Sequence, residues 1–291
     1  MKEIIVDKKY DGKKLNSFLL DSFDGLNLNT LYKALRKKDI RVNDVKVSEN
    51  VTVNLGDNIK IYISDNQLFR VNNFNIDIIY EDENIVVVNK PAEVEIVGEN
   101  SLTSKVLGYY KSKEIKNVFI EPCHRLDRNT NGLVLFAKNE TALNILLDKF
   151  KKREIEKHYR ALIYGVPKKR EHTLVSYLFK DAKKSFVYIS DIPKKGYEKI
   201  VTSYKLIFYN KNNNTSILDV NLHTGKTHQI RAHLAHIGLY IIGDGKYGNG
   251  DINKSFKCKY QQLCSYSIEF CFTTDSGILN YLNGKKISLG S

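Results

Sequence analysis

Apolar positions along the first 65 residues follow the spacing expected of a small mixed unit of helices and strands. Two stretches, near 15–19 and 29–38, place apolar residues three and four apart, as one buried helix face requires. Short alternating stretches predict strands at 3–6, 40–43, 45–47 and 58–63. Asn43-Asp44 is turn-prone and predicts a hairpin between the two middle strands. We therefore expect residues 1–65 to form one small α/β domain.

The rest of the chain combines many short apolar runs with few helical patterns. Residues 66–75 are polar and rich in asparagine, which predicts a linker. The apolar patterns beyond it predict strands at 76–79, 85–88, 133–136, 159–163, 217–220 and 268–272, and helices at 103–109, 140–150 and 227–236. Strict alternation of strand and helix is absent. Residues 76–291 are therefore predicted to form an α+β domain around a largely antiparallel mixed sheet.

Charge and cysteine content narrow the class of protein. The 291 residues include 46 Lys and Arg against 33 Asp and Glu, a net charge of +13, and most of this excess lies after residue 65. Such an excess favours a polyanionic partner, most simply nucleic acid. The four cysteines form no C-x-x-C pair, which is typical of buried or idle thiols in a reducing cytosol. With no pattern for a signal peptide or a membrane span, we expect a cytoplasmic protein without membrane association.

The most informative segment is HRLDRNTNGL, residues 124–133, in which Asp127 stands between two arginines just before an apolar run. Neighbouring cations favour an ionised carboxylate, which can act as a nucleophile or a base. From the residues alone, a structural Arg–Asp network is the commoner outcome. The segment resembles the H-R-L-D-x-x-T-S-G-L signature of the RluA-type pseudouridine synthases, with Asn131 at the usual Ser. In that family the Asp is the catalytic nucleophile.

Three further segments resemble the same family in the same order. They are IYEDENIVVVNKPA (79–92), KHYRAL (157–162) and TGKTHQIRAH (224–233), and Gly243-Asp244 with Tyr247-Gly248 completes the last block. The resemblance, which runs from about 76 to 250, implies that Asp127 is the nucleophile. It also implies that Tyr159 lies beside the target base, that Arg231 pairs with Asp127, and that Arg125 fills the gap left by a flipped base.

The first domain resembles a different family. The order of LYKALRKKDIRVNDVKV and GDNIKIYI is similar to the alpha-L RNA-binding motif, a small domain shared with a ribosomal small-subunit protein. A charge run by itself is usually a solvated helix face. The resemblance instead implies an RNA-binding face made of Lys33, Arg36, Lys37, Lys38 and Arg41. Together the two domains resemble the RluC and RluD subgroups, which act on large-subunit (23S) ribosomal RNA.

Two departures from the family pattern affect loops near the site. After Pro91-Ala92 the family usually continues with Gly, a hydrophobic pair and His-Pro, whereas this chain reads EVEIVG. Lys226 replaces the usual Arg, which keeps the charge and loses a bidentate fork.

Several patterns allow rival interpretations. The crowded histidines His223, His228, His233 and His236 could suggest a metal site, but no H-E-x-x-H motif is present. Residues 243–248 satisfy G-x-G-x-x-G, yet 249–254 are polar and turn-like and do not resemble the start of a helix. The basic stretch 149–157 is either a solvated helix end or a phosphate contact beside the site. We expect no metal and no nucleotide cofactor.

These patterns together predict a monomeric isomerase, an RNA pseudouridine synthase. It would modify specific uridines during rRNA modification and processing, most simply in 23S rRNA or a ribosome assembly intermediate. The mechanism would depend on an aspartate and on base flipping, without a cofactor. Whether the aspartate attacks the base or the ribose stays open. The alternative is a non-catalytic RNA-binding or ribosome-assembly protein that retains the synthase fold.

Overall fold

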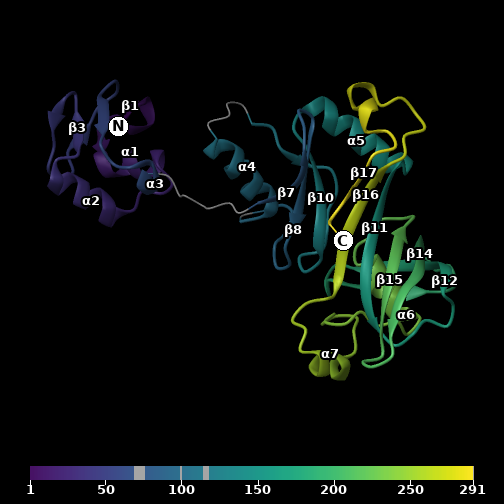
Figure 1. The fold of residues 1–291 in the computed structure, drawn as a ribbon. Helices are drawn as coiled ribbons and strands as arrows, with labels where there is room; N and C mark the ends of the chain where they lie inside the picture. Colours follow the sequence, from purple (N-terminus) through teal and green to yellow (C-terminus); the bar gives the residue numbers. More distant parts are fainter. Residues whose placement is uncertain (69–75, 99, 114–117, 291) are drawn as a thin grey trace. The chain divides into compact units, whose positions relative to one another are not determined.

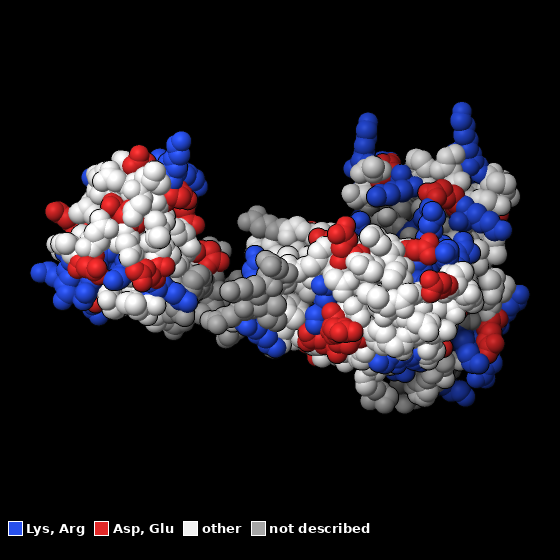
Figure 2. Space-filling view, turned by 90° about the horizontal axis from the view of Figure 1, so that it is seen from above, with Lys and Arg blue, Asp and Glu red and all other residues white. Residues whose placement is uncertain are grey.

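The computed structural model describes residues 1–68, 76–98, 100–113 and 118–290, which divide into two compact units, 1–74 and 75–291 (Figure 1). Each unit has its own buried apolar core. On the face shown in Figure 2, basic side chains lie between groups of acidic ones on both units. Within the described ranges, no helix has both the length and the apolar character that a membrane crossing requires.

The first unit packs two helices against a small antiparallel sheet. Its elements are β1 (Lys2–Ile5), η1 (Lys8–Tyr10), β2 (Lys13–Lys14), α1 (Leu15–Ser22), α2 (Leu28–Lys37), β3 (Ile40–Val42), β4 (Val45–Lys46), β5 (Thr52–Val53), β6 (Asn58–Ile61) and α3 (Asp65–Leu68). The main sheet has the order β1-β6-β3-β4, and β2 pairs with β5. The predicted hairpin is confirmed, because Asn43 and Asp44 link β3 to β4 with φ of 49° and 66°. Positive φ at both residues is what a tight two-residue hairpin turn requires.

The predicted linker, 66–75, is only partly testable. Residues 69–75 lie outside the described residues. Residues 65–68 form α3, and Leu68 is fully buried in the core of the first unit. The prediction that the linker begins at 66 was therefore wrong, because one apolar side chain in a polar stretch is enough to anchor it.

The second unit is built on one large sheet. Its elements are β7 (Asp77–Glu81), β8 (Ile85–Lys90), α4 (Leu102–Ser112), β9 (Glu121–Pro122), β10 (Asn131–Ala137), α5 (Glu140–Lys152), β11 (Ile155–Tyr164), β12 (Glu171–Asp181), β13 (Phe186–Ser190), β14 (Glu198–Asn210), β15 (Thr215–Leu222), α6 (Gln229–His236), α7 (Gly250–Phe256), β16 (Leu263–Phe270), η2 (Gly277–Leu282) and β17 (Lys286–Ser288). The sheet has 11 strands in the order β13-β12-β14-β15-β11-β16-β10-β8-β7, with β17 on β16 and β9 on β10. Pairing between the described strands is antiparallel apart from β10–β16, so the predicted α+β fold with a largely antiparallel sheet is confirmed.

Two parts of this unit differ from the sequence expectation. Strands β12, β13 and β14 were not predicted, because exposed residues interrupt their apolar positions. The expectation that 249–254 is not a helix start was wrong. The Asn249 side chain accepts the backbone N–H groups of Asp251 and Ile252 and so caps α7, which buries none of its own residues. A helix without an apolar face carries no periodic signal.

The parallel contact between β10 and β16 depends on Gly132. This residue has φ of 112°, and a Cβ built there would overlap the backbone carbonyl of Ser265. The register pairs Gly132 with Ser265 on one side and with Lys90 of β8 on the other. The close approach therefore fixes the strand that begins directly after the loop carrying Asp127.

We expect Gly132→Ala to destabilise the protein. The added methyl group must push β16 away and must also adopt a left-handed backbone, so the free energy of unfolding should fall by about 1–3 kcal/mol or more. Urea denaturation followed by circular dichroism measures this. Gly250→Ala is the matched control, because a Cβ at Gly250 meets no atom within 4 Å. Equal stability of the two variants would contradict the close-packing argument.

Candidate active site

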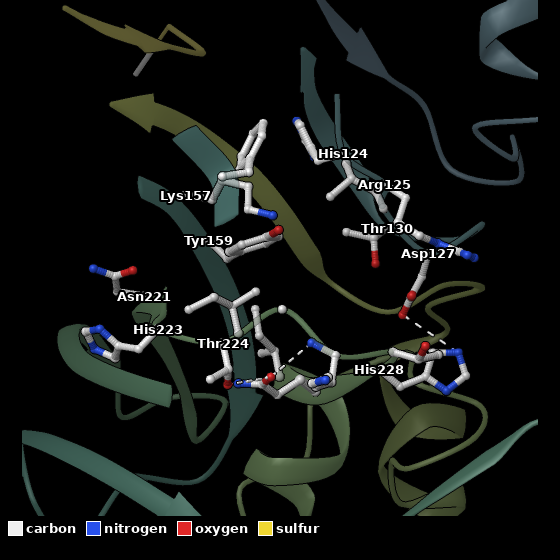
Figure 3. Close-up of a pocket in the computed structure, with 18 of the residues that line it drawn as sticks. His124, Arg125, Asp127, Thr130, Lys157, Tyr159, Asn221, His223, Thr224 and His228 are labelled. Carbon is white, nitrogen blue, oxygen red and sulfur yellow. Dashed lines mark hydrogen bonds and ion pairs between the residues drawn. The ribbon is translucent and has the colours of Figure 1, made fainter. Parts of the chain in front are cut away.

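Asp127 lies in a loop at the edge of a hollow of about 600 Å³ (Figure 3). The hollow is lined by the 123–127 loop, by β11, and by the segment that joins β15 to α6. The Asp127 side chain is 22% exposed. It is therefore sheltered by the protein and still open to a molecule that enters the hollow.

The Asp127 loop is fixed from both ends by buried polar groups. His124 Nε2 accepts the backbone N–H of Leu135 at 3.1 Å, which ties this end of the loop to β10. At the other end, the Lys90 ammonium donates to the carbonyl oxygens of Pro91, Val94 and Arg128 at 2.8, 2.8 and 2.9 Å. Lys90 is fully buried, and burial lowers its pKa to about 8. This lysine ties the loop after β8 to the residue next to Asp127.

Arg231 is bound to two carboxylates at once. Its Nε and Nη2 donate to Asp244 at 2.7 and 2.9 Å, and its Nη1 donates to Asp127 Oδ2 at 2.9 Å. The predicted pairing of Arg231 with Asp127 is thus present. Bidentate binding by Asp244 fixes the plane of the guanidinium, so the third N–H group has one direction in which to point.

Asp244 is in turn held by its own loop. Its Oδ1 accepts the backbone N–H groups of Lys246 and Tyr247 at 2.9 and 3.0 Å. Burial alone would raise the pKa of this carboxyl, but the hydrogen bonds from Arg231 and its positive charge outweigh burial and lower the pKa. Asp244 therefore acts as the fixed anion that orients Arg231.

Tyr159 comes from β11 and lies across the hollow from Asp127 (Figure 3). Its ring is buried, and burial, with a smaller contribution from the charge of Asp127, raises the pKa of the phenol. The phenol is therefore protonated at neutral pH. The structure brings all three predicted catalytic residues, Asp127, Tyr159 and Arg231, to one hollow.

Arg125 and the basic residues of the first unit lie at the surface. Arg125 is exposed and lines the same hollow as Asp127. The first unit's predicted RNA-binding residues, all but the last exposed, are Lys33, Arg36, Lys37, Lys38 and Arg41. The Arg41 guanidinium lies 5.1 Å from the centre of the Tyr62 ring, so this side chain is partly packed against the protein.

The basic stretch 149–157 divides into residues with different surroundings. Lys149 is fully buried, where it donates to Glu154 Oε2 and to the carbonyl of Thr274 at 2.6 Å each. It is therefore structural and cannot contact phosphate. Lys151 and Lys157 line the hollow, and burial lowers the pKa of Lys157 to about 8.

The crowded histidines have separate partners. His223 contacts Ser203, His233 contacts Thr202, and His236 contacts Asp191, at 2.8, 3.0 and 2.9 Å. His228 contacts Tyr247 Oη at 2.9 Å. Across the parts of the chain that the structure describes, no three His, Cys, Asp or Glu side chains are grouped in a way that could hold a metal ion.

A second hollow, of about 660 Å³, shares Arg125, Asp127 and His228 with the first. Its other basic lining residues are Arg231, which also lines the first hollow, and Arg128, Lys180, Lys246 and Lys259. The atypical loop after Ala92 borders this region. Glu93, with φ of 68°, pairs with Lys259 at 3.2 Å, and its carbonyl accepts Arg128 Nε at 3.3 Å. Lys226, at the family's usual Arg, forms an ion pair with Glu198 on β14.

Sequence reasoning missed several residues that support the site. Asp244 was noted only as part of a motif, and Lys90 was not assigned a role. Gln229 was also missed, although its amide donates to Val201 and Thr202 and its Oε1 accepts from Thr224, which anchors the start of α6 to β14. The usable signal was a lysine or aspartate directly after an apolar run, where a charged side chain needs a buried partner.

Comparison with known proteins identifies the family. Residues 84–236 match the family model described as RNA pseudouridylate synthase. The chain is 30% identical over 267 residues to the ribosomal large subunit pseudouridine synthase C of Buchnera aphidicola, covering 87% of this chain and 83% of that protein. This chain belongs to the RNA pseudouridylate synthase family. Membership confirms the predicted RluA-type resemblance and the predicted enzyme class, an isomerase that acts on RNA.

Two further relatives of the synthase are informative. This chain is 32% identical over 303 residues to an uncharacterized RNA pseudouridine synthase of Mycoplasma capricolum. The matched region covers 99% of this chain and 97% of that protein. The solved structure of human RNA pseudouridylate synthase domain containing 1 shares the fold, with a TM-score of 0.61 and 22% identity over 75% of this chain and 84% of that one.

The synthase should lose part of its stability in acid through Asp244. Because folding lowers the pKa of this carboxyl, its contribution is fully present above the unfolded value of roughly 3.9 and is lost as the pH falls through the lower folded value. At pH 7 we expect Asp244→Asn to reduce the free energy of unfolding by about 3–5 kcal/mol. The difference from wild type should shrink as the pH falls below about 4, where the carboxyl of the unfolded chain takes up a proton that the folded protein still excludes.

Urea titrations at several pH values measure this difference. Asp251→Asn is the control, since its side chain is 98% exposed. A difference between wild type and Asp244→Asn that stays constant with pH would contradict the assigned role of the ion pair.

Proposed function

We propose that this synthase converts specific uridines of large-subunit (23S) ribosomal RNA to pseudouridine, with Asp127 as the nucleophile. The observation that carries the proposal is the Asp127 carboxylate, which Arg231 binds at 2.9 Å on the edge of a hollow that also contains Tyr159. A carboxylate oriented by a guanidinium and open to a hollow can attack an electrophilic carbon. The reaction needs no cofactor, because the atoms of uridine are only rearranged.

The depth of the site supports base flipping. Asp127 is 22% exposed and lies at the edge of the hollow rather than on an open surface. A uridine stacked in a helix cannot bring its glycosidic bond to such a carboxylate, so the nucleotide must be extruded. Tyr159 would then stack against the uracil, and Arg125, exposed beside Asp127, would fill the space that the base leaves.

The names of the relatives support a ribosomal substrate. Synthases of Buchnera aphidicola and Rickettsia felis, at 30% and 32% identity, are named ribosomal large subunit pseudouridine synthase C. We therefore place the synthase in rRNA modification and processing, with 23S rRNA or a ribosome assembly intermediate as its partner. It would act as a cytoplasmic monomer.

The test of this function is a map of modified uridines. The purified synthase is incubated with unmodified 23S rRNA transcript, and pseudouridine is located by carbodiimide labelling and primer extension. Modification at discrete positions supports the proposal. RNA binding without pseudouridine formation in 23S rRNA, ribosome precursors or tRNA would favour the alternative, a non-catalytic RNA-binding protein that retains the fold.

Asp127→Asn should abolish turnover and leave the protein folded. Asn has almost the same shape and can still accept a hydrogen bond from Arg231, but an amide is not a nucleophile. We expect no measurable multiple turnover, with RNA affinity and thermal unfolding close to wild type. Asp148→Asn, at a half-exposed side chain of α5, is the matched control and should keep full activity. Turnover by the Asp127→Asn variant would refute the mechanism.

The basic face of α2 should contribute to RNA affinity through phosphate contacts. Released counterions make the slope of log K against log [salt] depend on the number of contacts, by about 0.7–0.9 for each. Replacing Lys33, Arg36 and Lys37 together by Gln should reduce the magnitude of this slope by about 2–3 if each contacts a phosphate. The control replaces the same number of exposed lysines elsewhere in the unit, namely Lys8, Lys13 and Lys14. Equal slopes in the two triple variants would identify the α2 face as solvated surface.

A further inference from the structure

A chain of hydrogen bonds leads from the second unit's sheet to the side of Asp127. The backbone N–H of Val187 on β13 donates to Tyr247 Oη at 2.9 Å, and Tyr247 Oη lies 2.9 Å from Nδ1 of His228. The other ring nitrogen of His228, Nε2, lies 4.0 Å from Asp127 Oδ2. His228 therefore links the buried Tyr247 to the reacting carboxylate and lines both hollows.

The hydrogen-bond partners of Tyr247 and His228 indicate where the phenol proton and the imidazole proton lie. Tyr247 is buried, and burial raises the pKa of its phenol, so the phenol keeps its proton. Of the two partners at the Tyr247 oxygen, the Val187 N–H group can only donate, so His228 Nδ1 is the one that can accept the phenol's O–H group. An imidazole nitrogen that accepts a hydrogen bond carries no proton, so the proton of neutral His228 is on Nε2.

The surrounding charges keep the ring neutral. Burial is the main cause that lowers the pKa of His228, and Arg231 and Lys246 act in the same direction, while Asp127 and Asp244 oppose them. At neutral pH the ring is therefore an uncharged donor. Its Nε2–H group has no hydrogen-bond acceptor among the described residues, because the 4.0 Å to Asp127 Oδ2 is too long for a hydrogen bond.

We propose that His228 donates this Nε2–H group to a carbonyl oxygen of the target uracil while the base is detached. The inference rests on the proposed function. When the C1′–N1 bond breaks, its electron pair leaves with the uracil, and the negative charge spreads over N1 and the carbonyl oxygens. Asp127 bonds to C1′ in place of N1, and this C1′–O bond breaks, its electron pair returning to Asp127, when the C1′–C5 bond forms. C5 then releases its proton and N1 takes one up, so no atom or electron is gained or lost.

A fixed donor suits this step better than a mobile one. The Tyr247 hydroxyl sets both the tautomer and the direction of the His228 ring before the substrate arrives. A preorganised N–H group aimed at an oxygen where charge develops stabilises the transition state more than the ground state. His228 thereby stabilises the negative charge on the detached uracil, while Asp127 acts as the nucleophile.

The backbone at His228 allows a discriminating pair of variants. His228 has φ of 55° and ψ of 16°, a left-handed conformation at the start of α6, and its side chain makes no capping bond there. Asn adopts this conformation more readily than Gln does. Conversely, the amide nitrogen of Gln reaches the place of Nε2, whereas that of Asn reaches only the place of Nδ1. If His228 acts as a donor, the Gln variant should be more active than the Asn variant. If His228 serves only the left-handed backbone, the Asn variant should be the more active one.

The experiment measures single-turnover rates on saturating 23S rRNA transcript. We expect His228→Asn to be about 10²-fold slower than wild type, and His228→Gln to retain a rate at least about tenfold above that of His228→Asn. RNA affinity should stay within about twofold of wild type in both variants, because the donor acts as charge develops. His236→Gln is the control on the same helix, since His236 contacts Asp191 and lines neither hollow.

The outcomes separate this inference from the proposed function. If wild type forms pseudouridine and His228→Asn is as fast as His228→Gln or faster, the donor role is overturned and His228 serves only the backbone. If wild type forms no pseudouridine in any RNA tested while it still binds RNA, the proposed function fails first. Rates in the order wild type, His228→Gln, His228→Asn support the inference.

Discussion

The site depends on a single guanidinium shared by two carboxylates. Asp244 binds two nitrogens of Arg231 and leaves one N–H group for Asp127. An arginine can do this because its donors are coplanar and fixed in angle, which the single ammonium of lysine does not offer. Arg231 thereby joins two segments that are far apart in sequence. One is the turn after α6, which carries Asp244, and the other is the loop before β10, which carries Asp127.

Other residues of the second unit hold the Asp127–Arg231–Asp244 group in place. Gly132 lets β10 approach β16, Lys90 ties the residue after Asp127 to the loop behind β8, and Gln229 anchors the start of α6. Each of these groups is buried, so each needs its polar partners inside the protein. The network is costly to disturb and therefore holds the Asp127 carboxylate in one geometry.

The sequence predicted those parts of the structure that depend on local order. Helix faces such as that of α2, the Asn43-Asp44 hairpin and the apolar run after Gly132 are visible because neighbouring residues determine them. The triad of Asp127, Tyr159 and Arg231 was found by resemblance to a long signature. Strand β14, the pairing of Arg231 with Asp244 and the burial of Lys149 were not predicted, because they depend on partners distant in sequence. The short helix α7 escaped because its stability comes from a cap and not from an apolar face.

The shared guanidinium also separates two regions of opposite charge. Around Asp127 and Asp244 two carboxylates face one cation, so this part of the site is formally negative. The adjoining hollow is lined by Arg125, Arg128, Lys180, Lys246 and Lys259, with Glu95 also in its lining and Glu93 paired with Lys259. Phosphate groups are attracted to these basic side chains and repelled by the two carboxylates, whereas an uncharged uracil ring is not. Such a field would favour a nucleotide that approaches with its base toward Asp127, as the proposed base flipping requires.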